Sequence, residues 1–202
     1  MSSTDTTQSV PESIPETLAS TPSPAGISGD YVLDPAHTRI GFSARHAMVT
    51  KVRGAFHEFE GIAHVDAQNP ANSTVRVTIQ TASLSTGSDQ RDGHLRSPDF
   101  FNVERYPEIT FVSTDVKRDG ADWTITGDLT ITDVTKPVSV VFEETGAATD
   151  PFGNERVGFE GSVTINRGDW GLKWNAALEA GGVLVSEKVT LEFDVSAIRQ
   201  KG

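Results

Sequence analysis

The sequence contains no cysteine, so it offers neither a disulfide framework nor thiol chemistry. Basic residues are scarce: 17 lysines and arginines stand against 28 aspartates and glutamates, which gives the 202 residues a formal net charge of −11. Surfaces that follow nucleic-acid phosphates carry the opposite balance, so no nucleic-acid partner is expected. No uninterrupted apolar stretch has the length of a membrane-spanning helix, so no transmembrane segment is expected either.

The motifs that accompany catalysis or metal binding are also missing. The histidines are scattered, without the close spacing of a metal-ligand pair, at His37, His46, His57, His64 and His94. Neither a Gly-x-Ser-x-Gly nucleophile elbow nor a phosphate-binding Gly-x-x-x-x-Gly-Lys-Ser/Thr loop occurs. The sequence therefore predicts no catalytic residue, no metal site and no cofactor.

Residues 1–29 differ in composition from the rest of the chain. They are rich in serine, threonine and proline and lack lysine and arginine, which predicts a disordered tail before a single domain over residues 30–202. A secretory signal would begin with basic residues and continue with an apolar run, and this segment has neither. A cytoplasmic location is therefore expected.

From Tyr31 onward the sequence alternates apolar and polar residues in short segments separated by turn residues. The segments are 37–46, 53–65, 73–83, 109–117, 122–132, 136–144, 155–166 and 187–195. This pattern predicts an all-β fold, either an extended antiparallel up-and-down barrel of about eight strands or a two-sheet sandwich. The barrel is favoured, because an open sheet of this size would leave two edges that nothing in the sequence protects.

Three glycines bear on whether this barrel is hollow. Gly61, Gly127 and Gly161 fall within the apolar phase of their segments, where a packed interior would carry larger side chains. They predict an apolar lumen that suits an elongated apolar ligand. The alternative is that they only allow the strands to coil sharply, and the sequence leaves both interpretations open.

Alternation stops between residues 88 and 102, where a short helical insert is expected. Thr86 with Asp89 has the spacing of a capping box, and Ser97 followed by proline suggests a second helix start. Leu95, Phe100 and Phe101 would give the insert an apolar underside. It is either an ordinary crossover packed on the sheet or a lid over one open end of the barrel.

Taken together, these segments resemble the YceI-like family of lipocalin-like, polyisoprenoid-binding bacterial proteins. The resemblance covers roughly residues 31–198 and rests on the motifs at Leu33–Met48, Val52–Phe56, Asp92–Phe111, Gly127–Ile131, Thr135–Val138 and Ile165–Leu172. It implies a barrel that encloses a polyisoprenoid, an isoprenoid quinone or a related lipid and performs no chemistry on it. Many relatives are exported to the periplasm, which contrasts with the missing signal sequence here.

The resemblance and the inward phase of the strands together give a set of candidate ligand contacts. The resemblance implies lumen contacts at Phe42, Phe111, Trp123, Phe142, Phe159 and Leu191. The inward phase of the strands adds Ile125, Leu129, Val140, Val163 and Phe193. The resemblance places His94, Asp99, Phe100 and Phe101 in the covering segment, and Trp170 and Trp174 are expected to close one barrel end.

The sequence leaves three functions open. The leading hypothesis is non-enzymatic binding, storage or transport of a long apolar ligand. A second is a filled barrel that serves as a stress-response or protein-interaction module. A third is an enzyme that acts on an isoprenoid-type ligand, with His94, His46 or Asp99 as acid or base. The sequence does not decide whether the protein forms a homodimer.

Overall fold

The structure is a computed structural model that describes residues 24–179 and 181–201. Most of the predicted tail, residues 1–23, lies outside the described residues. The last part of that segment belongs to the fold, because Pro24–Ile27 forms the 3-10 helix η1 and Ile27 is almost fully buried.

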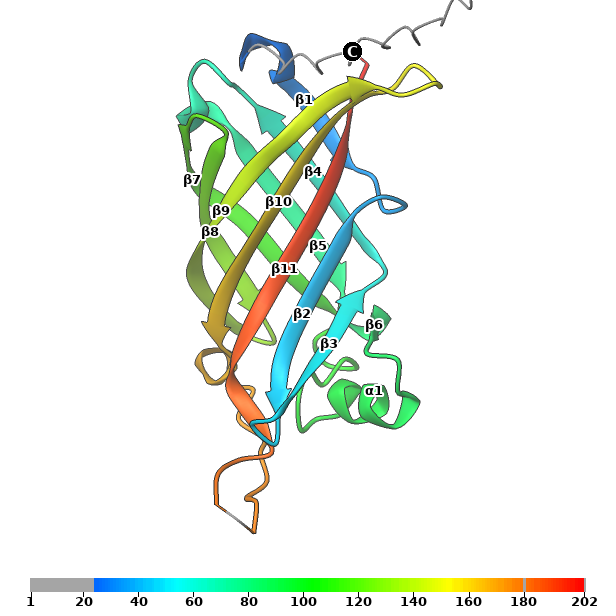
Figure 1. Cartoon of the computed structure of the whole chain (residues 1–202), viewed down its shortest axis with the longest axis vertical. Helices are drawn as coiled ribbons and strands as arrows, with labels where there is room; N and C mark the ends of the chain where they lie inside the picture. Colours follow the sequence, from blue (N-terminus) through cyan, green and yellow to red (C-terminus); the bar gives the residue numbers. More distant parts are fainter. Residues whose placement is uncertain (1–23, 180, 202) are drawn as a thin grey trace, which may run out of the picture.

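Eleven β-strands and one α-helix make up the domain (Figure 1). The strands are β1 (Gly29–Leu33), β2 (Arg39–His46), β3 (Thr50–Phe56), β4 (Phe59–Val65), β5 (Thr74–Gln80), β6 (Leu84–Ser85), β7 (Glu108–Asp119), β8 (Asp122–Ile131), β9 (Val134–Thr149), β10 (Glu155–Asn166) and β11 (Val185–Arg199). The helix α1 spans Asp89–Arg96, and further 3-10 turns lie at η2 (Pro70–Asn72), η3 (Thr81–Ser83) and η4 (Arg167–Trp170).

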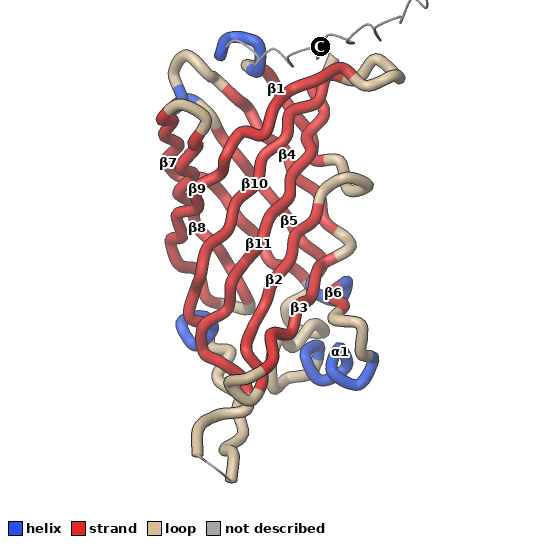
Figure 2. The backbone as a smooth tube through the Cα atoms, viewed as in Figure 1, coloured by secondary structure: helices blue, strands red, loops and turns tan. Residues whose placement is uncertain are grey.

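The strands close into a barrel in which all pairings are antiparallel (Figure 2). The ring runs β1-β4-β5-β7-β8-β9-β10-β11, and β1 pairs with β11 to complete it. β1 and β2 both pair with β11, one after the other along its length, and β4 and β3 pair with β1 and β2 on their other side. The strands β1 and β2 therefore share one position in the barrel wall, and β3 and β4 share the next. The predicted barrel is therefore confirmed, and the two-sheet sandwich is not the fold.

The two ends of the barrel carry different loops. At the upper end in Figure 1 lie the β9–β10 hairpin, η1 and the last residues of β11. At the lower end lie the β2–β3 turn and the β10–β11 loop, with α1 beside them. We use "upper end" and "lower end" in this sense below.

The helical insert is present where the sequence predicts it, but its caps differ. Asp92, not Asp89, accepts hydrogen bonds from Thr86, and the backbone N–H donates at an N···O distance of 2.9 Å. Ser97 does not start a second helix: its N–H donates to the carbonyl of His94 at 3.1 Å and ends α1. The chain then runs through hydrogen-bonded turns to β7, so the predicted Asp89 cap and Ser97 start are both wrong.

The interior consists of two clusters of buried apolar side chains. The lower cluster includes Ile40, Leu84 and Trp170, while the upper cluster includes Ile27, Tyr31 and Trp123. Phe142 packs against both. Several side chains between the clusters point inward and yet stay only partly buried, which places free space in the middle of the barrel.

An apolar cavity as the candidate ligand-binding site

A cavity of about 270 Å³ occupies the interior between the two buried clusters. Its walls are almost wholly apolar and extend from Tyr31 and Trp123 near the upper end to Leu172 and Phe100 near the lower end. The polar tip of Tyr31 is already engaged, since its hydroxyl donates to the carbonyl oxygen of Ile27 at 2.9 Å. The volume is close to the lower limit of small-molecule pockets, roughly 300 Å³, and the composition suits hydrocarbon.

The predicted lumen residues lie on the wall of this cavity, with one exception. Those on the wall are Phe42, Phe111, Trp123, Ile125, Leu129, Val140, Phe142, Phe159, Leu191 and Phe193. Val163 packs against the lower cluster but does not reach the wall. Their period-two spacing brings them together because alternate residues of a strand face the same side of the sheet. Whether they contact a ligand stays a prediction.

Side chains, not empty space, cover the inward glycines. A Cβ atom built on Gly127 would lie 2.5 Å from Cζ of Phe111 and 2.5 Å from the carbonyl oxygen of Val112. Gly161 is covered by Phe142 in the same manner, and Gly61 by the side chain of Leu33. The glycines thus allow neighbouring side chains to lie flat against the wall, a third possibility that neither sequence interpretation included.

The insert between β6 and β7 covers the lower part of the cavity. Leu95, Phe100 and Phe101 reach the cavity wall. Phe101 also stands edge-on to Phe56, with ring centroids 6.0 Å apart. The insert therefore contributes apolar surface to the site, as a lid would.

The remaining predicted mouth residues lie away from the cavity wall. His94 contacts the ring of Trp174 at a centroid distance of 4.5 Å and hydrogen-bonds Asp99 at 2.9 Å, with both polar side chains partly exposed. Trp170 is buried, and its indole N–H donates to the carbonyl oxygen of Leu129 at 3.0 Å. These residues hold the lower end together from outside the cavity.

Arg167, the first residue of η4, holds the β10–β11 loop in place. Its side chain is buried, and its guanidinium donates to the backbone carbonyls of Ser186 at 2.9 Å and Val185 at 3.3 Å. A further bond reaches the carbonyl of Leu172, so Arg167 joins the two ends of the β10–β11 loop. Burial lowers the pKa of this guanidinium. A single arginine in a Gly-rich segment carries no signal for such a role.

Two ionisable residues, His64 and Arg167, belong to the cavity lining, and His64 is hydrogen-bonded to Asp30 at 2.7 Å. In residues 24–179 and 181–201, no three histidine, aspartate or glutamate side chains come close enough to hold a metal ion. His46 is exposed at the end of β2, and the His94–Asp99 pair lies outside the cavity wall. None of the helices in these ranges has the length and apolar character to cross a bilayer.

A closed antiparallel barrel around an apolar cavity defines the class of lipocalin-like barrels. The family model for the YceI-like domain matches residues 31–197, so this chain belongs to the YceI-like family, as its motifs predict. It is 39% identical to protein YceI of Escherichia coli over 179 residues, which cover 88% of this chain and 91% of that protein.

Solved structures agree with this assignment. The YceI protein of Campylobacter jejuni is 30% identical, with a TM-score of 0.66 over 84% of this chain and 97% of that chain. A polyisoprenoid-binding domain from Saccharophagus degradans is 17% identical, with a TM-score of 0.63 over 84% of this chain and 98% of that chain. The second likeness bears on the fold alone.

Proposed function

We propose that this protein binds a long isoprenoid chain, such as a polyprenol or the tail of an isoprenoid quinone, and stores or carries it without chemical change. The observation that carries the proposal is the elongated apolar cavity, whose wall offers a ligand almost no hydrogen-bonding group. Such a wall selects hydrocarbon by shape and by burial of apolar surface. The structural neighbour described as polyisoprenoid-binding shares the barrel fold, so a barrel of this kind is compatible with the proposed ligand class.

The two other hypotheses have less support. A barrel filled by its own side chains would leave inward residues fully buried, whereas Phe111 and Phe193 line free space and remain partly accessible. An enzyme would need an acid or base directed into the cavity. The His94–Asp99 pair does not lie on the cavity wall, and His64, which belongs to the lining, is half exposed and pairs with Asp30. We also propose that the protein is cytoplasmic.

Burial gives a rough affinity for a test ligand. Geranylgeraniol has about 21 non-hydrogen atoms, and at about 0.3 kcal/mol per atom it would bind with about 6 kcal/mol, a Kd on the order of 10–100 µM. Longer chains from cells would bind more tightly and remain bound during purification. Native mass spectrometry of the freshly purified protein, followed by organic extraction, should therefore find a polyprenyl or quinone species.

A matched pair of variants on β4 tests the position of the ligand. Ala63 lines the cavity, whereas its neighbour Ile62 points outward with 59% of its surface exposed. Ala63→Phe should lower ligand occupancy at least about tenfold, because the added ring fills space that the chain needs. Ile62→Phe should load like the wild type. Equal loading of both folded variants would place the ligand elsewhere and overturn the proposal.

A further inference from the structure

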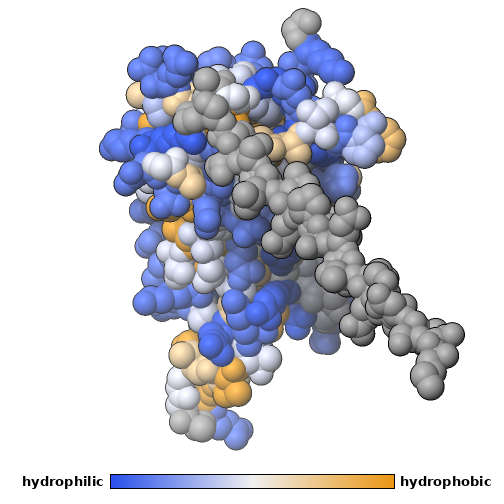
Figure 3. Space-filling view, turned by 45° about the horizontal axis from the view of Figure 1, so that its top comes forward, coloured by the Kyte–Doolittle hydropathy of each residue, from blue (hydrophilic) through white to orange (hydrophobic). Residues whose placement is uncertain are grey.

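Apolar side chains are exposed at the lower end of the barrel. Met48 and Val49 in the β2–β3 turn have 60% and 77% of their surfaces exposed, and Val183 in the β10–β11 loop has 37%. The N–H of Ala47 donates to the carbonyl of Leu184 at 2.7 Å, so the turn and the loop lie side by side. We name Met48, Val49 and Val183 the apolar tip. Orange residues also gather on the lower lobe of the molecule in Figure 3.

The geometry of the β2–β3 turn does not explain these side chains. Ala47 and Met48 both have positive φ angles, 50° and 61°, and the N–H of Val49 donates to the carbonyl of His46 at 3.1 Å. Turns of this kind favour asparagine and glycine, which adopt positive φ at low cost. Alanine and methionine adopt positive φ angles less readily, and the side chain of Met48 projects into water. Neither turn chemistry nor solubility accounts for this choice.

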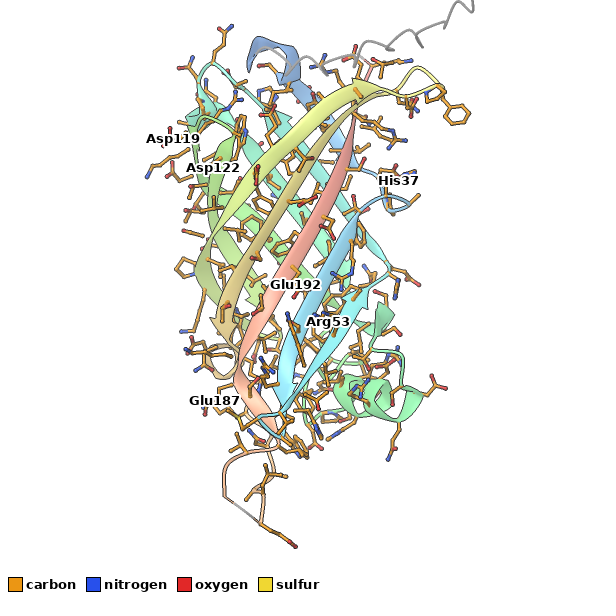
Figure 4. The ribbon with its side chains drawn as sticks, viewed as in Figure 1. His37, Arg53, Asp119, Asp122, Glu187 and Glu192 are labelled. Carbon is orange, nitrogen blue, oxygen red and sulfur yellow. The ribbon has the colours of Figure 1, made fainter. Side chains whose placement is uncertain are left out.

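Basic residues surround the apolar tip. Arg45, Lys51 and Lys188 lie near the adjoining ends of β2, β3 and β11, together with the acidic residue Glu187. Arg53 lies in the middle of β3 and Glu192 in the middle of β11. Figure 4 labels Glu187 near this end, Arg53 above it and Glu192 near the middle of the barrel. The β10–β11 loop adds Lys173 and Glu179, which offset one another. We name the four basic residues the basic collar, and a surface hollow lined by Met48, Val183 and Lys188 joins it to the apolar tip.

The local excess of positive charge stands out in a chain with a net charge of −11. Lys51 pairs with Glu192 at 3.1 Å, but Arg53 and Lys188 form no ion pair within the described residues. Acidic residues gather at the opposite end, where Figure 4 labels Asp119 and Asp122.

Salt screens the charges of the acidic upper end from an anionic surface that meets the lower end. β11 has 15 residues, a length of about 50 Å at about 3.3 Å per residue, or about 35 Å along the axis of a barrel with tilted strands. The Debye length at physiological ionic strength is about 8 Å. An anionic surface that meets the lower end therefore interacts mainly with the basic collar.

The tip is also close to the cavity. Val185 pairs with His46 at the base of the β2–β3 turn, and the side chain of Val185 lines the cavity. Ala44 lines the cavity from the same end of β2. A ligand that enters beside the tip would therefore meet the apolar wall within a few residues of the surface.

We propose that the apolar tip and the basic collar dock the barrel on an anionic lipid bilayer, where the cavity takes up or releases its apolar ligand. The inference rests on the proposed function, because it supplies the route by which a water-insoluble chain reaches the cavity. Exposed apolar side chains enter the boundary between head groups and acyl chains, while lysine and arginine bind anionic head groups at about 1 kcal/mol each.

Vesicle flotation tests the docking step. The full chain should float with vesicles of phosphatidylglycerol and phosphatidylcholine, bind pure phosphatidylcholine vesicles more weakly, and lose affinity as salt is raised. The double variant Met48→Ser, Val49→Ser should bind at least about fivefold more weakly, and Arg53→Glu, Lys188→Glu at least about tenfold. Phe152→Ser is the control, since Phe152 is 87% exposed at the upper end, and it should bind like the wild type.

Loading from detergent separates this proposal from the proposed function. Geranylgeraniol dispersed in detergent should load the tip and collar variants as it loads the wild type, whereas transfer from the anionic vesicles should be slower for both. If Ala63→Phe is the only variant that fails to load, the failure is caused by the filled cavity and does not contradict the docking proposal. Unchanged flotation of both double variants would overturn the docking proposal. So would tip-dependent self-association in size-exclusion chromatography without vesicle binding, which would identify a dimer interface instead.

Discussion

Pairs of an aromatic ring and a glycine shape the cavity wall residue by residue. Phe111 lies over Gly127, Phe142 over Gly161 and Phe42 over Gly54, so that a Cβ on any of these glycines would meet the ring at 2.4 to 2.7 Å. The rings lie along the wall and leave the centre of the barrel free for a ligand. The width of the cavity therefore depends on the absence of a single carbon atom at each glycine.

Gly127→Ala should destabilise the protein by about 1–3 kcal/mol, because the new Cβ would lie 2.5 Å from the carbonyl oxygen of Val112, which cannot rotate away as a side chain can. Gly93→Ala is the matched change in α1, where a Cβ meets nothing within 4 Å, and it should stabilise the protein by up to about 1 kcal/mol. Urea denaturation measures both. Equal stability of Gly127→Ala and the wild type would show that the wall can move aside.

The sequence predicts which side chains face inward but not how they fill the interior. Alternation correctly placed Ile125 and Leu129 inside, because it follows from the geometry of a single strand. The packing of Phe111 on Gly127 joins two strands in a particular register, and a local pattern does not contain that register. For the same reason the alternation does not show that a larger side chain at Gly127 would meet the carbonyl oxygen of Val112.

At the scale of elements, polar side chains fasten α1 to the barrel. Asp92 is 4% exposed and accepts from the backbone and hydroxyl of Thr86. Arg96 donates to the carbonyls of Ala82 at 2.9 Å and Leu84 at 2.6 Å. Only a few apolar residues connect the insert to the interior, so these bonds decide how firmly the lid is closed.

Asp92→Ala should loosen the insert without unfolding the barrel. The partly buried N–H of Thr86 loses its partner, which costs about 1–3 kcal/mol locally. Amide hydrogen exchange over residues 88–101 should accelerate about tenfold or more, while exchange in β8 and β10 changes less. Asp89→Ala is the control, since Asp89 is exposed at the start of α1 and bonds no other described side chain. Identical exchange in both variants would contradict the anchoring role of Asp92.

The sequence predicts the position of the insert but not the side chain that anchors it. The break in alternation identified it, and the helix itself covers only Asp89–Arg96 of the predicted residues 88–102. Asp89 and Asp92 both lie in the first turn of α1, and only the docking of α1 decides which of them turns inward. The choice depends on tertiary contacts, so the spacing of a capping box was misleading.

For the whole molecule, an ion-pair cluster fastens the upper end. Arg156 on β10 bonds Asp34, which follows β1, and bonds Asp150 in the β9–β10 hairpin at 2.8 Å. The guanidinium of Arg156 lowers the pKa of Asp34. The pKa of Asp150 is lowered further, first by the backbone N–H of Asn154 and then by Arg156. Three separate segments of the wall thus meet at one cation.

These shifts predict a pH dependence of stability. A carboxylate with a depressed pKa stabilises the folded state above its unfolded pKa, about 3.9, and this contribution disappears as the pH falls through the lower folded pKa. Arg156→Gln should therefore have a lower Tm than the wild type at pH 7, and the difference should shrink as the pH falls below about 4. Thermal melts from neutral to acidic pH measure it. A constant difference would assign the effect of Arg156 to packing.

The sequence predicts the number of strand positions in the barrel wall, but it does not predict which strands close the barrel. Eight alternating segments predicted the eight wall positions, because each segment reports its own burial. The interruptions between β1 and β2 and between β3 and β4 were not predicted, and neither was the exposed tip at Met48 and Val49. The closing pair of β1 with β11 joins distant parts of the chain, so its identity required the family resemblance or the structure.

That closing pair also affects how the protein folds. Tyr31 and Arg199 face each other across the seam although 168 residues separate them, a contact that a growing chain forms only after almost all the other strands exist. Loop-closure entropy makes such contacts late and slow. Until the seam closes, β1 and β11 present unpaired edges that favour aggregation. The rate of seam closure, rather than equilibrium stability, should therefore limit the yield of soluble protein, and slower synthesis at low temperature should raise that yield.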